Sequence, residues 1–201
     1  LYTERELEHQ LKDSGARAMV MVSEFMATAE KVLPKTPVET LIVTNIFDMM
    51  EAQPAPETAL ADQLRLVTLP DVLAAGADLP LPSVDAGMTD IAILQYTGGT
   101  TGVAKGAMLS QGNIYTYVRQ AETMRAADPG YSKDKAELLI APLPIYHIFG
   151  FTLYLVGNFA SGGQSVLIPD PRNLDGMMDI MKSYRFTGFA AVNTMLVGML
   201  Q

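Results

Sequence analysis

The stretch that most constrains the fold of this chain is a glycine- and threonine-rich loop at residues 96–105. It reads Tyr-Thr-Gly-Gly-Thr-Thr-Gly-Val-Ala-Lys, follows the apolar run at 91–94 and precedes Gly-Ala-Met-Leu at 106–109. This pattern predicts a strand, a loop and a second strand. Glycines can adopt positive φ angles and approach a ligand closely, and backbone amides in such a turn form a concavity that binds anions. Because hydroxyl groups and the Lys105 ammonium add donors, the loop predicts a phosphate-binding site.

Two commoner phosphate loops do not fit these residues. The loop of nucleotide hydrolases needs Gly-Lys-Ser/Thr in direct succession, but two residues separate Gly102 from Lys105. The dinucleotide-binding fingerprint needs Gly-x-Gly-x-x-Gly leading into a helix, whereas here adjacent glycines are followed by an apolar pair at 107–108. A hairpin that binds nothing is the structural alternative, but it explains neither the threonine pair nor the lysine.

The string Thr-Gly-Gly-Thr-Thr-Gly-x-x-Lys-Gly resembles the phosphate-binding loop of the adenylate-forming (AMP-binding) superfamily, which includes acyl-CoA synthetases, luciferases and peptide-synthetase adenylation domains. The resemblance implies that threonine hydroxyls and glycine amides of this loop hold the phosphates of ATP. It also assigns Thr100 to Mg²⁺. The residues implied to bind the nucleotide are Tyr96, Thr97, Gly98, Gly99, Thr100, Thr101, Gly102 and Lys105.

A second candidate site is the segment at 142–151, Pro-Leu-Pro-Ile-Tyr-His-Ile-Phe-Gly-Phe, which follows a predicted buried strand at 138–141. Open parallel sheets place their ligands at the carboxyl ends of strands. A lone histidine among apolar residues is, however, more often a core group. The segment is similar to the Pro-x-aromatic-His motif of adenylate-forming enzymes, and the whole string looks like that of bacterial long-chain fatty acyl-CoA synthetases.

By this resemblance, His147 is the catalytic residue beside the acyl carboxylate. The stretch 186–194 is implied to begin one wall of the acyl tunnel, although a core strand followed by a turn explains its pattern equally well. The residues implied to bind the acyl substrate are Tyr146, His147, Phe149, Phe151 and Asn193.

The order of apolar runs and amphipathic stretches predicts an α/β fold, a mainly parallel sheet flanked by helices, which the resemblance makes part of the adenylate-forming N-terminal domain. A proline-rich region at about 49–90 predicts an irregular connection with one helix near 57–66. Strands are expected at 18–22, 39–44, 91–94, 106–109, 138–141, 164–168 and 187–192. Helices are expected at 3–14, 25–33, 111–127, after 151 to about 159, at 174–184 and from 194 onward.

Charge and composition restrict the partners of the protein. The net charge of −8 argues against binding to nucleic acid, because phosphate backbones are bound by basic surfaces. The sequence has no cysteine, which excludes disulfides and thiolate metal sites and favours a cytoplasmic protein. No uninterrupted apolar run reaches 18 residues, so a membrane-spanning helix is not expected. Peripheral contact with the inner membrane and a homodimer both stay open.

The resemblance extends over residues 1–201 but over less than half of a family member. Nothing in the sequence matches the Tyr-Gly-x-Thr-Glu motif, the ribose-binding Asp, the hinge or the catalytic Lys of the family. The expectation is therefore an incomplete AMP-binding N-terminal domain without the C-terminal domain, inactive in isolation. Its parent protein would be an ATP-dependent long-chain fatty acid–CoA ligase that uses ATP, Mg²⁺ and coenzyme A and forms an acyl-adenylate. The alternatives are a fragment of an aryl- or amino-acid-adenylating enzyme and a non-catalytic nucleotide-binding or interaction lobe.

Overall fold

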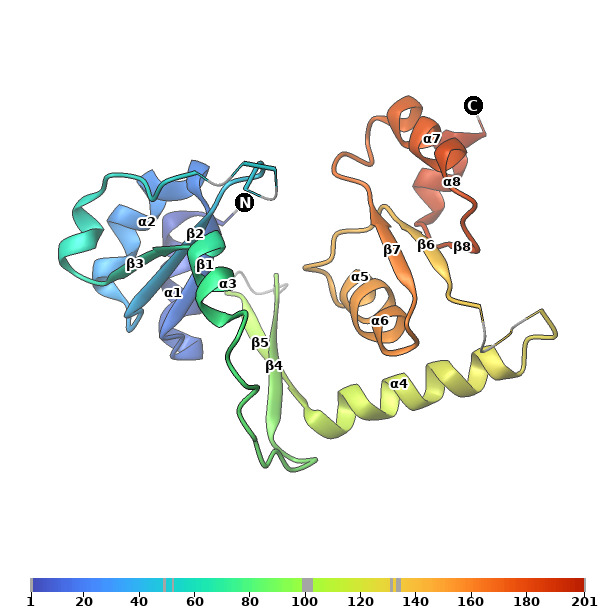
Figure 1. Cartoon of the computed structure of the whole chain (residues 1–201), viewed down its shortest axis with the longest axis horizontal. Helices are drawn as coiled ribbons and strands as arrows, with labels where there is room; N and C mark the ends of the chain where they lie inside the picture. Colours follow the sequence, from blue (N-terminus) through green and yellow to red (C-terminus); the bar gives the residue numbers. More distant parts are fainter. Residues whose placement is uncertain are drawn as a thin grey trace. The chain divides into compact units, whose positions relative to one another are not determined.

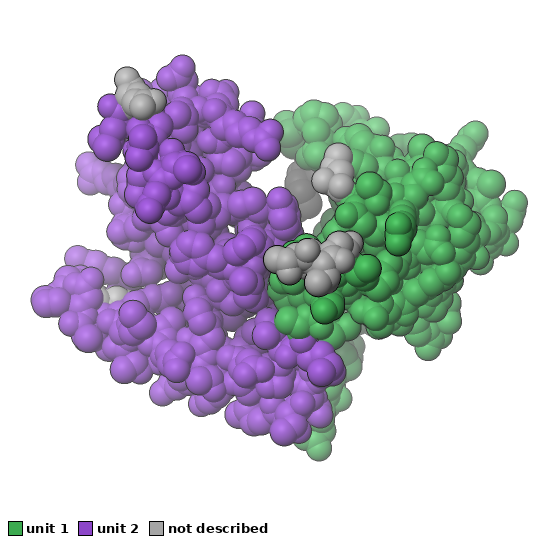
Figure 2. All heavy atoms as spheres, turned by 180° about the vertical axis from the view of Figure 1, so that it is seen from behind, with its two compact units in different colours: residues 1–85, 94–107 green, residues 86–93, 108–201 purple. Residues whose placement is uncertain are grey.

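The computed structural model describes residues 2–48, 50–51, 53–98, 103–130, 132 and 135–200 (Figure 1). The chain divides into two compact units, which Figure 2 shows in different colours. Unit 1 comprises residues 1–85 and 94–107, and unit 2 comprises residues 86–93 and 108–201. Each unit is described by itself.

Unit 1 is built on a three-stranded parallel sheet in the order β1-β2-β3, flanked by helices (Figure 1). The register places Ala18 opposite Thr40 and Thr40 opposite Arg65. The elements are α1 (Glu4–Ser14), β1 (Ala18–Val22), η1 (Ser23–Phe25), α2 (Met26–Val32), η2 (Leu33–Lys35), β2 (Thr40–Thr44), η3 (Ala59–Asp62), β3 (Arg65–Thr68) and α3 (Leu69–Gly76).

Local sequence signals set the ends of helix α1. Thr3 and Glu6 form a capping box, in which each side chain accepts from the backbone N–H of the other residue. Gly15 ends the helix in the left-handed conformation at φ 64°, which glycine adopts without steric cost. Leu11 on this helix joins a core that also contains Val32, Leu33 and Leu41. Burying each such side chain stabilises the unit by about 1.5–3 kcal/mol.

The region at 49–90 is more regular than the sequence analysis predicts. The helix expected near 57–66 is wrong, because only a short 3₁₀ turn, η3, forms there. Strand β3 and helix α3 follow it, and neither was predicted. The sequence did contain a signal for α3: the Thr68 side chain caps the helix through the N–H of Asp71, and Pro70 lies in the first turn.

Unit 2 contains a second parallel sheet, with β6 between β7 and β8. Ile140 of β6 is fully buried and packs with Met177 of α7. Arg125 of α4 donates to Ser161 Oγ at 2.5 Å and ties α4 to the end of α6. The elements are α4 (Gln111–Ala126), β6 (Leu138–Ala141), α5 (Ile148–Gly150), the π-helical segment η4 (Phe151–Gly157), α6 (Asn158–Ala160), β7 (Gln164–Leu167), α7 (Leu174–Ser183), β8 (Gly188–Phe189) and α8 (Asn193–Met199).

Strands β4 (Ile91–Thr97) and β5 (Lys105–Ser110) are hydrogen-bonded neighbours in a two-stranded sheet, and the division between the units passes through them. The predicted α/β class with mainly parallel pairing is therefore confirmed, although the parallel pairs lie in two separate sheets. The last predicted strand, 187–192, is reduced to the two residues of β8. Within the described residues, every helix is too short or too polar to cross a membrane.

Candidate functional site

The two strands that carry the predicted phosphate loop bring its ends together. Thr97 is the last residue of β4 and Lys105 the first of β5, and the two strands are hydrogen-bonded neighbours. Both side chains are exposed, as is Gly98. The other predicted loop residues, Gly99, Thr100, Thr101 and Gly102, lie outside the described residues. The proposed Mg²⁺ ligand Thr100 is therefore among the residues on which the structure gives no information.

Lys105 presents an uncompensated positive charge at the end of the loop. Its side chain is exposed, and among the described residues no carboxylate lies within 4.0 Å of its ammonium group. A lysine without an acidic neighbour attracts an anionic ligand more strongly than one in an ion pair. This arrangement is what a phosphate-binding lysine needs.

The Tyr96 side chain contacts helix α1 through its hydroxyl and Gly106 of β5 through its ring. Its hydroxyl donates to Asp13 Oδ2 of helix α1 at 2.5 Å. Burial, followed by the hydrogen bond and charge of Asp13, raises the pKa of Tyr96 to about 12. A Cβ atom at Gly106 would lie 3.0 Å from the ring, so only glycine leaves the ring its full space there. The Tyr96 hydroxyl thus bonds to Asp13, and the contact of Tyr96 with a nucleotide stays a prediction.

The other end of the loop also contacts helix α1. His9 Nε2 lies 2.9 Å from the carbonyl oxygen of Ala104, and because that oxygen can only accept, the ring nitrogen donates. His9, Asp13 and Gly106 are site residues that the sequence analysis did not identify. The spacing of His9 and Asp13 places them on one face of a helix, but nothing in the sequence indicated which segment that face contacts.

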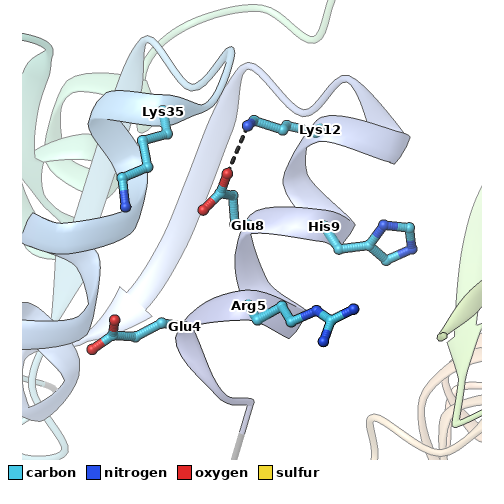
Figure 3. A pocket seen from close by; sticks show the side chains of 6 residues that line it. All are labelled: Glu4, Arg5, Glu8, His9, Lys12 and Lys35. Atoms are coloured by element: carbon cyan, nitrogen blue, oxygen red, sulfur yellow. Dashed lines mark hydrogen bonds and ion pairs between the residues drawn. The ribbon is translucent and has the colours of Figure 1, made fainter. Parts of the chain in front are cut away.

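A surface groove of about 450 Å³ lies beside helix α1 and is lined by Glu4, Arg5, Glu8, His9, Lys12 and Lys35 (Figure 3). Lys12 and Glu8, one turn apart on α1, form an ion pair at 2.6 Å (Figure 3). In Figure 3 the His9 ring points away from Lys35 and Glu4. The groove has charges of both signs, and His9 is the lining residue that touches the loop.

His147 lies in the segment that follows β6, at the start of a helical stretch. It is the N-cap of α5, and its Nδ1 accepts from the Phe149 N–H at 3.2 Å. The neutral ring therefore carries its proton on Nε2, for which no hydrogen-bond partner is found among the described residues. Because His147 is exposed, the alternative of a satisfied core histidine does not apply. Its Nε2–H is available to donate to a ligand.

Close backbone packing fixes the position of the histidine segment. A Cβ atom at Gly150 would lie 2.4 Å from the Pro144 carbonyl oxygen, so the turn before His147 folds directly onto the helix that follows it. Around His147, Tyr146 is 80% exposed and Phe149 is 45% exposed, while Phe151 is half-buried. Exposed aromatic side chains beside a hydrogen-bond donor suit a ligand with an apolar portion and a carboxylate.

Asn193 is the first residue of α8, and its side chain is exposed. The segment that leads to it is linked to η4, because the Tyr154 hydroxyl donates to the Ala190 carbonyl oxygen at 2.7 Å. Tyr154 is only 2% exposed, and burial raises its pKa to about 12. This contact connects the helical stretch after His147 with the strand region before Asn193.

The described residues do not offer a complete site for Mg²⁺. No group of three acidic, histidine or cysteine side chains converges among them in a way that could hold a metal ion. Mg²⁺ is bound by a few carboxylates together with water and substrate phosphates.

The glycine- and threonine-rich segment lies between two paired strands, and the histidine segment follows a parallel strand, within an α/β fold. The sequence model of the family described as "AMP-binding enzyme" matches residues 1–201. The chain therefore belongs to this family.

The chain is similar to curated relatives and to solved structures, of which two relatives and one structure are given. The chain is 40% identical to the long-chain-fatty-acid–CoA ligase of Yersinia pestis over 100% of its own length and 37% of that protein. It is 26% identical to 4-coumarate–CoA ligase 3 of Arabidopsis thaliana, over 98% of the chain and 32% of that protein. The structure of the ATP-bound RpMatB-BxBclM chimera B3 superposes with a TM-score of 0.70 at 28% identity, covering 100% of this chain and 34% of that one. The chain thus spans about a third of the length of the curated relatives it matches.

Proposed function

We propose that this chain is a segment of a longer enzyme, here called the parent ligase, which activates a long-chain fatty acid with ATP and transfers the acyl group to coenzyme A. The proposal is carried by the 40% identity to the long-chain-fatty-acid–CoA ligase of Yersinia pestis over the whole of this chain. The lower identity of 26% to 4-coumarate–CoA ligase 3 favours a fatty acid over an aryl acid.

The reaction has two steps. A carboxylate oxygen of the fatty acid attacks the α-phosphorus of ATP, and pyrophosphate leaves to give the acyl-adenylate. The thiol sulfur of coenzyme A then attacks the acyl carbon, and AMP leaves. Catalysis of the first step is mostly positioning and charge stabilisation, because the phosphates and the carboxylate repel each other.

Two segments of this chain would serve that first step. The exposed ammonium of Lys105 and the backbone of the loop would stabilise the negative charge of the β- and γ-phosphates. The Nε2–H of His147 would donate to the acyl carboxylate, with exposed Phe149 beside it against the acyl chain. Mg²⁺, which the family resemblance implies, would supply further positive charge at the phosphates. The described residues alone do not form its site.

The protein is proposed to be cytoplasmic. Peripheral contact with the inner membrane and a homodimer are proposed for the parent ligase.

The test is fatty-acid-dependent exchange of pyrophosphate into ATP by the parent ligase, with oleate and 4-coumarate compared as substrates. Oleate is expected to support exchange much better than 4-coumarate, and Lys105→Ala is expected to raise the KM for ATP about tenfold or more. The free energy of unfolding should change little, because substitution of an exposed lysine usually alters it by no more than about 0.5 kcal/mol. The 201-residue chain alone should show no exchange, because half a site cannot position both substrates. Exchange with 4-coumarate but not oleate would contradict the proposal.

A further inference from the structure

Helix α1 contacts both ends of the phosphate loop. At the start of the loop, the Tyr96 hydroxyl donates to Asp13 at 2.5 Å, and at its end His9 Nε2 donates to the Ala104 carbonyl oxygen at 2.9 Å. The contacts join residues 83 and 95 positions apart in the chain, and all of them belong to unit 1. His9 and Asp13 are four residues apart, so they lie on the same face of α1.

We propose that His9 and Asp13 are positioning residues for the phosphate loop, holding Tyr96 and Ala104 at the separation at which Lys105 meets the phosphates of ATP. The inference rests on the proposed function, since it assigns to α1 a part in nucleotide binding. It names no contact between α1 and the nucleotide itself: both residues act through the loop.

The placement of Asp13 supports a role beyond the helix. It lies in the last turn of α1, where the carbonyl end of the helix dipole disfavours a negative charge. No cation lies within 4.0 Å of its carboxylate among the described residues, so its recorded contact is the one with Tyr96. The Asp13 carboxylate does not favour the helix at this position, but it accepts a hydrogen bond from Tyr96. Its placement therefore serves the loop rather than the helix.

Gly106 provides independent support for the same arrangement. The Tyr96 ring packs over Gly106, where any Cβ atom would lie only 3.0 Å from the ring. The ring is thus confined between β5 and α1, and its hydroxyl is directed to Asp13. The Lys-Gly pair that ends the loop motif therefore has two separate tasks: Lys105 supplies charge, and Gly106 leaves space for the ring that anchors the loop.

The first measurement is amide hydrogen exchange of the peptide spanning residues 97–106 in the ligand-free parent ligase. His9→Leu removes the ring donor, and Asp13→Ala removes the acceptor. Each should speed exchange at Gly98, Val103 or Ala104 about fivefold, the factor equivalent to one hydrogen bond of about 1 kcal/mol. His9→Gln keeps a side-chain donor and should restore most of the protection. Lys12→Gln, which breaks only the exposed pair with Glu8 on the same helix, is the matched control.

The second measurement is kinetic. In pyrophosphate exchange, His9→Leu and Asp13→Ala should raise the KM for ATP about fivefold and leave the KM for oleate unchanged. Tyr96→Phe removes the same bond as Asp13→Ala, so the double variant should be no worse than the poorer single one. A merely structural role would instead lower the unfolding midpoint and leave the KM for ATP unchanged.

The outcomes separate the two proposals. If Lys105→Ala raises the KM for ATP while the His9 and Asp13 variants change neither loop exchange nor that KM, the positioning role is wrong and the proposed function stands. If the parent ligase shows no ATP-dependent reaction, the proposed function fails. In that case hydrogen exchange still decides whether α1 positions the loop. Faster exchange in both His9→Leu and Asp13→Ala supports the positioning role, and unchanged exchange refutes it.

Discussion

The exposed N-cap position of His147 allows its two ring nitrogens to be tested separately. Nδ1 accepts from the Phe149 N–H and stabilises the start of the helix, whereas Nε2–H is available to a ligand. His147→Ala removes both functions. His147→Asn keeps a side-chain oxygen near the position of Nδ1, and asparagine is among the best N-cap residues, but its short side chain cannot reach the position of Nε2.

The two functions have different magnitudes and different assays. Loss of an N-cap costs about 1 kcal/mol of stability, so His147→Ala should lower the free energy of unfolding by about that amount and His147→Asn by much less. Loss of a hydrogen bond to a charged carboxylate costs about 1.5–3 kcal/mol, which corresponds to a tenfold to hundredfold loss of rate or binding. Both variants should therefore lose adenylation to a similar extent.

The paired assay is oleate-dependent pyrophosphate exchange and urea unfolding of the ligand-free parent ligase. The expected pattern is that both variants lose exchange and that only the alanine variant loses stability. Normal exchange by His147→Asn would refute the assignment of Nε2 to the carboxylate. A loss of stability without a loss of exchange in His147→Ala would show that the residue serves only the helix.

Two further predictions concern the scaffold of the histidine segment. Gly150→Ala should destabilise the fold by about 1–3 kcal/mol in urea unfolding, because its methyl group would press on the Pro144 carbonyl oxygen; Gly76→Ala, with nothing within 4 Å of the added Cβ, is the control and should cost nothing. Burial raises the pKa of Tyr154 to about 12 from 10.0, so its contribution to stability is complete below pH 10 and is lost as the pH rises from 10 to 12. Tyr154→Phe should flatten this part of the profile of unfolding free energy against pH, and an unchanged profile would show that the phenol is not protected in the fold.

Features that depend on neighbouring residues were predictable from the sequence. The capping box of α1, its glycine stop and the strands β1, β2 and β6 follow from side-chain chemistry and apolar runs within a few positions. The phosphate loop was predicted as a strand, a loop and a strand, and its flanking strands form. Helix α3 carried an equally local signal at Thr68, but the many prolines of the surrounding region favoured an irregular connection.

Contacts between distant residues could not be predicted in this way. Strand β3 has only four residues, and its place beside β2 depends on the sheet into which it packs. The contacts of His9 and Asp13 depend on where α1 lies relative to β4 and β5, which no residue of α1 encodes. The π-helical form of η4 is likewise not evident in the sequence, which shows this segment only as apolar.

The order of strands in the two parallel sheets also affects how this chain can be handled. Among the described residues, β1 and β3 each pair on one side only, as do β7 and β8. Such outer strands carry unpaired N–H and C=O groups that a strand of another molecule can join, and Val20 on β1 is 59% exposed. The isolated chain should therefore self-associate through its sheet edges as its concentration rises. A lysine at position 20 would oppose this association by placing a charge on the open edge, and it offers a practical way to keep the 201-residue chain monomeric for binding measurements.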